Sequence, residues 1–78
     1  MNTTLKAIVN ALQPQIKPLQ ILPDPKDPNF LDIYDNTQLH AWIYHHTNSQ
    51  TIELYHTSHE YNLADPNLIK QLATIINK

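Results

Sequence analysis

The chain contains no cysteine, no glycine and no arginine, and each absence excludes a kind of site. Without cysteine there is no disulfide, no thiolate ligand for zinc and no cysteine nucleophile. Phosphate-binding loops and the nucleophile turn of serine hydrolases need glycine for positive φ angles and close backbone approach. We therefore expect neither nucleotide-dependent chemistry nor hydrolysis of those types.

Positive charge is scarce and scattered along the chain. All five cations are lysines, and seven carboxylates bring the net charge to −2. Nucleic-acid binding draws its affinity from clustered cations that neutralise phosphates, so the composition argues against a nucleic-acid partner. No basic run adjoins an apolar helix, which argues against attachment to an anionic membrane surface.

Long hydrophobic runs are also missing. No apolar stretch approaches the ~20 residues that a membrane-spanning helix requires. Asn10, Gln13 and Pro14 interrupt the only apolar run near the start, so we expect no secretory signal. The composition therefore predicts a cytoplasmic chain without membrane contact, and its 78 residues are enough for one small domain.

The first segment with helical spacing covers residues 3–13, where apolar residues recur at i, i+3, i+4 and i+7. Asn2 or Thr3 can cap its start. Pro14 lacks a backbone N–H, so we expect the helix to end at the residue before it.

A second amphipathic helix is predicted over residues 66–77. Asp65 is the expected N-cap, and Pro66 suits the first helical position. Between the first helix and the strands, residues 14–29 hold five of the six prolines. That density predicts a stiff, extended connector packed along the sheet, in which residues 19–22 can form a short edge strand.

Three segments, residues 30–34, 39–46 and 51–57, alternate between apolar residues and polar or aromatic ones. Alternation with period two is typical of strands with two different faces. We therefore predict a single α+β domain over residues 1–78, with an N-terminal and a C-terminal helix packed on one face of a three-stranded antiparallel sheet. The core face of the sheet would consist of Leu31, Ile33, Leu39, Ala41, Ile43, Ile52 and Leu54.

Two turns set the expected registers. Asp35-Asn36-Thr37 supplies turn residues, and Asn36 tolerates the left-handed conformation in place of glycine. A three-residue loop there would pair Ile33 with Leu39. An even-numbered loop would put core residues opposite surface residues, so parity favours a loop of three or five residues. A second turn centred on Asn48-Ser49 pairs Ile43 with Leu54, Trp42 with Tyr55, and Tyr44 with Glu53.

The side of the predicted sheet that faces away from the helices carries aromatic and imidazole side chains instead of plain polar ones. We call this side the aromatic face. A contiguous patch of this kind marks a contact surface, because aromatic residues with a polar tip bury much area at little entropic cost. The predicted partner-binding residues are Phe30, Tyr34, His40, Trp42, Tyr44, His46, Glu53 and Tyr55. Two alternatives are a small ligand, or internal cover by residues 14–29 or by the segment around Tyr61 and Leu63.

The histidines raise the alternative of an iron or zinc site. His40, His59 and Asp32 would meet on one face if the registers hold, and two imidazoles with a carboxylate suit these metals. His45 and His46 point to opposite faces, so we predict no metal and no cofactor. The pairing of His59 or His56 with Glu60 has no third orienting group, and we expect no catalytic residue and no enzyme activity.

The order helix, three strands, helix resembles the double-stranded RNA-binding domain in topology. That family grips phosphates with lysines at the start of its last helix, where this chain reads Asp65-Pro66-Asn67-Leu68-Ile69-Lys70. The resemblance implies an alternative function, a nucleic-acid-binding module that stacks bases on the aromatic face.

The favoured function is a non-catalytic protein-binding module. Small acidic chains without catalytic motifs often act as stoichiometric inhibitors, such as antitoxins, immunity proteins or phage-encoded blockers of host defence. The expected partner is another protein with a basic surface, which the negative charge would steer into contact, or a second copy of the chain in a homodimer.

Overall fold

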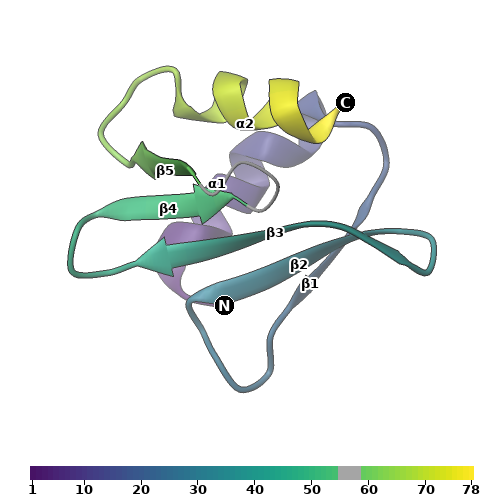
Figure 1. The fold of residues 1–78 in the computed structure, drawn as a ribbon, viewed down its shortest axis with the longest axis horizontal. Coiled ribbons are helices and arrows are strands. Elements are labelled where there is room, and N and C mark those ends of the chain that lie inside the picture. The colour runs from purple at the N-terminus through teal and green to yellow at the C-terminus, as the bar shows by residue number, and fades with distance from the viewer. Residues whose placement is uncertain (55–58) are drawn as a thin grey trace.

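The computed structural model describes residues 1–54 and 59–78, which form two helices and a five-stranded antiparallel sheet, with one helix before the strands in the chain and one after them. Helix α1 (Thr3–Leu12) runs into a short 3-10 turn, η1 (Gln13–Gln15), and helix α2 (Leu68–Ile76) follows the last strand. The strands are β1 (Gln20–Pro23), β2 (Phe30–Asp35), β3 (Gln38–His46), β4 (Thr51–Leu54) and β5 (His59–Asn62). They lie side by side in chain order, and every neighbouring pair is antiparallel (Figure 1).

The prediction of three strands was wrong, because the sheet has two further strands at its edges. β1 forms within the proline-rich segment, close to the expected residues 19–22, and pairs with β2. β5 pairs with β4, although of its four residues only Tyr61 packs against the core. Such short edge strands are held mainly by backbone hydrogen bonds rather than by buried side chains. Their sequences therefore alternate little between apolar and polar residues. With five strands, the topology no longer matches the helix, three strands, helix order of the RNA-binding domain.

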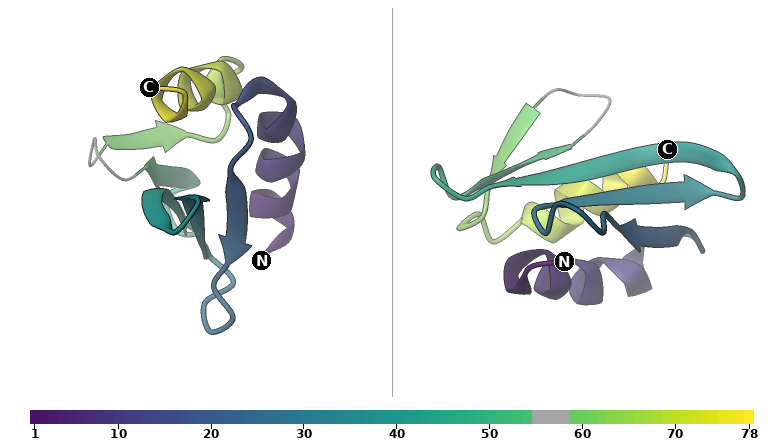
Figure 2. Two further views of the ribbon diagram at one scale, coloured as in Figure 1. Left: turned by 90° about the vertical axis from the view of Figure 1, so that its right-hand side faces the viewer. Right: turned by 90° about the horizontal axis from the view of Figure 1, so that it is seen from below.

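Both helices pack on the same side of the sheet and share one core with it (Figure 2). The buried side chains of the helices are Leu5, Ile8, Val9, Leu12, Leu68, Leu72, Ala73 and Ile76. Those of the sheet are Leu31, Ile33, Ala41, Ile43, Ile52 and Leu54. Within the described residues, neither helix has the length and apolar character needed to cross a membrane.

Asn2 is the N-cap residue of α1. Its Oδ1 accepts a hydrogen bond from the Leu5 N–H at 2.8 Å, which satisfies one of the amide groups left unpaired at a helix start. The α-helix ends at Leu12 rather than at the predicted residue 13, and Pro14 lies in the tighter η1 turn.

Helix α2 begins two residues later than predicted. Asp65 is not its N-cap: the Asp65 carboxylate accepts a hydrogen bond from the Asn67 N–H at 2.9 Å, and its carbonyl accepts one from the Leu68 N–H at 3.1 Å. These bonds close a turn before the helix, which explains why the Asp-Pro pair precedes α2 instead of starting it.

The hairpin of β2 and β3 has a two-residue turn, with Asp35 paired to Gln38 and Asn36 at a φ of 56°. The left-handed Asn36 was predicted, but the three-residue loop was wrong. An even-numbered loop would set Ile33 opposite a surface residue, and a β-bulge at His40 prevents this: Ile33 pairs with Ala41 instead of Leu39.

The hairpin of β3 and β4 has the predicted register. Ile43 pairs with Leu54 and Tyr44 pairs with Glu53. The predicted pair of Trp42 with Tyr55, and the end of the expected strand 51–57, lie outside the described residues.

Candidate functional site

The aromatic face is built from rows of side chains that cross the strands. Because the alternate residues Leu31, Ile33 and Ile43 are buried beneath the helices, their neighbours along β2 and β3 point to the opposite side. Three rows form the face in the described residues: Leu22–Asp32–Trp42, Phe30–Tyr44–Glu53–Glu60, and Gln20–Tyr34–Leu39. A fourth row, His46–Thr51–Asn62, lies at one end of the face.

The rings on this face contact one another. Phe30 stacks on Trp42 with ring centroids 5.3 Å apart and an interplanar angle of 27°. Tyr44 lies 5.9 Å from Phe30, and its ring meets His46 edge-on at 4.8 Å. All four side chains are half-buried, and with these contacts they form a continuous and preorganised surface along β2 and β3.

Two exposed leucines extend the apolar surface beyond the rings. Leu22 on β1 is 41% exposed and Leu39 on β3 is 45% exposed, and their strand partners place both on the aromatic face. Sequence reasoning missed both. Leu22 lies in the proline-rich segment, and Leu39 was predicted in the core because the bulge that reverses its side is not visible in an alternating pattern.

His40 does not lie on the aromatic face, contrary to the prediction. Its Nε2 donates a hydrogen bond to the carbonyl oxygen of Ile76, 2.6 Å away at the end of α2. The bulge turns the side chain toward the helices, where it satisfies a carbonyl that the helix end leaves unpaired.

The structure therefore brings six of the eight predicted site residues together on one face: Phe30, Tyr34, Trp42, Tyr44, His46 and Glu53. His40 is on the other side of the sheet, and Tyr55 lies outside the described residues. The segments proposed as internal cover lie elsewhere. β1 extends the sheet beside β2, and Tyr61 and Leu63 pack against the core.

The charged groups on this face are carboxylates. His46 contacts two of them, since its Nε2 is 2.9 Å from Glu53 Oε1 and 3.5 Å from Glu60 Oε1. Asp32 is half-buried between Leu22 and Trp42, and its carboxylate has no hydrogen bond or ion pair with any other described residue. None of the five lysines lies in a described strand.

The suggested metal ligands do not meet. Asp32 pairs with Trp42 on the aromatic face, whereas His40 bonds to α2 on the other side of the sheet. His59 lies on β5, where its ring meets Tyr61 edge-on at 4.8 Å. Among residues 1–54 and 59–78, no group of three or more His, Cys, Asp or Glu side chains is arranged so that it could hold a metal ion.

A partly buried polar network connects α1 to the strands that carry the aromatic face. The Asn2 side-chain amide donates to Asn29 Oδ1 at 2.7 Å and to His45 Nδ1 at 3.0 Å. His45 is 7% exposed, and its backbone N–H donates to the Asn29 carbonyl at 2.8 Å. His45 lies between Tyr44 and His46 on β3. This network therefore anchors the strand from the side of the sheet that faces the helices.

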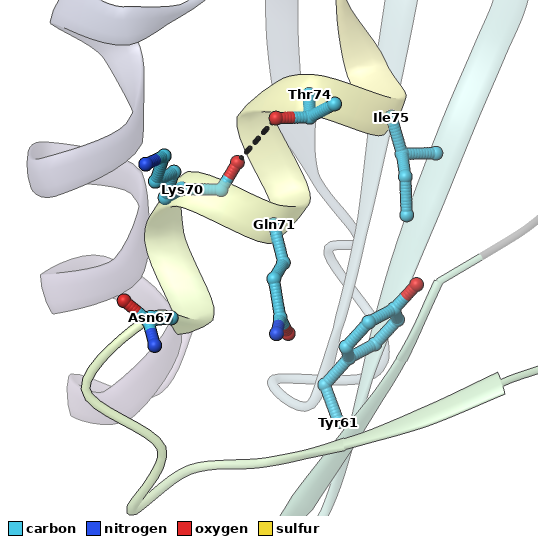
Figure 3. Close-up of a pocket in the computed structure, with 6 residues that line it drawn as sticks. All are labelled: Tyr61, Asn67, Lys70, Gln71, Thr74 and Ile75. Atoms are coloured by element: carbon cyan, nitrogen blue, oxygen red, sulfur yellow. Dashed lines mark hydrogen bonds between the residues drawn. The ribbon is translucent and has the colours of Figure 1, made fainter.

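A second candidate site is an open hollow of about 510 Å³ between β5 and α2. It is lined by Tyr61, Asn67, Lys70, Gln71, Thr74 and Ile75. Gln71 and Ile75 project from the side of α2 nearest Tyr61, and the Thr74 hydroxyl donates to the Lys70 carbonyl at 2.8 Å (Figure 3). The six described residues that line it carry amide, hydroxyl, phenol, ammonium and aliphatic groups.

No known protein family, curated protein or solved structure matches this chain. The function is therefore inferred from the chemistry and geometry of its own surface.

Proposed function

We propose that this chain is a non-catalytic protein-binding module that docks a partner on its aromatic face. The observation that supports this most directly is the contiguous surface of Phe30, Trp42 and Tyr44, with the exposed Leu22 and Leu39 beside it. Both helices are on the opposite side of the sheet. An apolar patch of this kind on a small domain is typical of an interface.

The mode of binding follows from the stiffness of the surface. The rings are already in contact, so little side-chain freedom is lost when a partner covers them. Aromatic anchors of this kind carry a large part of the binding energy in many interfaces. We extend the proposal to a small cytoplasmic inhibitor of the antitoxin, immunity or anti-defence type, acting by stoichiometric coverage of its target.

Charge supports a protein partner over nucleic acid. The aromatic face carries Asp32, Glu53 and Glu60, and none of the lysines lies in a described strand. Carboxylates repel phosphates, whereas they attract a protein surface rich in cations and accelerate its association at low salt.

The proposal is tested by asking whether binding of a partner protein depends on the aromatic face. We expect the chain to capture a protein that, once purified, binds at a ratio of one to one. The substitution Trp42→Ala should weaken that binding by about tenfold or more, because it removes a central ring of the interface. Gln71→Ala in the hollow beside α2 is the matched control and should bind as the parent chain does. Calorimetric titration measures both.

Equal affinity of Trp42→Ala and the parent chain would contradict the proposal. So would retention of single-stranded RNA or DNA by the parent that Trp42→Ala abolishes, since this would assign the rings to base stacking.

A further inference from the structure

We propose that the partner inserts an arginine side chain at Asp32, in the centre of the aromatic face. The inference rests on the proposed function and adds the chemistry of the contact. It identifies the partner as a protein whose docking surface presents an arginine to a carboxylate bordered by aromatic rings.

Asp32 is surrounded by apolar and aromatic side chains. Leu22 and Trp42 are its partners on the two adjacent strands, and Phe30 and Tyr34 are its neighbours on the same face of β2. Asp32 is half-buried, and its carboxylate has no hydrogen bond or ion pair with any other described residue. A carboxylate that is further desolvated by a docked partner needs a cation and hydrogen-bond donors, because an unpaired buried charge is costly.

The ring beside Asp32 suits a planar cation. Trp42 is directly opposite Asp32 on β3, and Phe30 holds it by stacking at 5.3 Å. A guanidinium group can stack on an indole while its N–H groups donate to a carboxylate, which combines a cation–π contact with a charge-assisted pair. An ammonium group lacks the plane and is more strongly hydrated, so the site favours arginine over lysine.

The chain cannot supply this arginine itself, because its sequence contains none. A second copy offers only lysines, none of which lies in a described strand. The site therefore fits a different protein rather than a homodimer.

The test uses three capped tripeptides, acetyl-Ala-X-Ala-amide, in which X is arginine, lysine or citrulline. Citrulline has the shape of arginine without its charge. Binding to the full chain is followed by the fluorescence of Trp42, the single tryptophan, and by the amide shifts of β2 and β3. We expect the arginine peptide to bind about fivefold or more tightly than the citrulline peptide, with the lysine peptide weaker than arginine.

The substitution Asp32→Asn keeps the shape and removes the charge, so the preference for arginine over citrulline should fall to about one. Asp65→Asn is the matched control. It makes the same change of net charge beside α2, keeps an acceptor for the Asn67 N–H, and should leave the preference unchanged.

Equal binding of the arginine and citrulline peptides would overturn the arginine site, as would a preference that survives Asp32→Asn. Lysine binding as tight as arginine would also overturn it, because any cation would then suffice. None of these results tests whether the aromatic face as a whole binds a partner protein. The proposed function fails separately, when Trp42→Ala leaves binding of the purified partner unchanged.

Discussion

Asn2 shows how much one polar residue can organise in a small chain. It caps α1 through Oδ1, and through its amide group it reaches both Asn29 and the buried His45. The same residue therefore begins a helix and connects that helix to the strands of the aromatic face. The N-cap was predictable from residue type, whereas the contact with His45, 43 positions away, depends on the packing of α1 against the sheet.

We predict that Asn2→Ala lowers the free energy of unfolding by about 1–2 kcal/mol, since both the cap and the partly buried hydrogen bonds to Asn29 and His45 are lost. Urea denaturation measures the change. Asn10→Ala on the exposed side of α1 is the control and should shift stability by less than about 0.5 kcal/mol. An Asn2→Ala variant as stable as the parent would contradict the role assigned to the network.

The bulge in β3 is the element that decides which side chains reach the aromatic face. Upstream of it, Leu39 pairs with Tyr34, and downstream of it Ala41 pairs with Ile33. His40 is left over and contacts the end of α2. Alternation correctly predicted the faces of residues 41–46, but it placed Leu39 in the core and His40 outside. A strand pattern assumes one uninterrupted register, and the inserted residue breaks that assumption.

The bulge leads to a prediction about the stability of two variants. Leu39→Ala should cost less than about 1 kcal/mol, because Leu39 is already 45% exposed to solvent. Ile43→Ala, which empties a fully buried site on the same strand, should cost about 2–5 kcal/mol. Thermal or urea unfolding of both variants distinguishes the two positions. A loss for Leu39→Ala as large as that for Ile43→Ala would mean that Leu39 belongs to the core.

The whole molecule has two layers, with helices on one side of the sheet and the aromatic face on the other. A chain of this size buries only roughly 60–65% of its unfolded surface, so much apolar surface stays available for a partner. The proposed arginine contact at Asp32 favours a different protein as the partner, because the chain contains no arginine of its own.

We therefore predict that the isolated chain sediments as a monomer of 9.0 kDa. Sedimentation equilibrium over a range of concentrations measures this mass. A species of twice that mass that Trp42→Ala converts to monomer would contradict the prediction and would assign the aromatic face to self-association.

The amino-acid sequence by itself determined the α+β class, the two helices, the antiparallel central strands and most of the aromatic face. These features depend on local periodicity: residues such as Leu5 and Ile8, or Trp42 and Tyr44, share a side because of their spacing alone. Only the tertiary structure decided the two edge strands, the position of His40 and the placement of Leu22 and Leu39. Each of these depends on pairing between segments, where one extra residue in a strand or a short edge ladder changes the outcome without altering the local pattern.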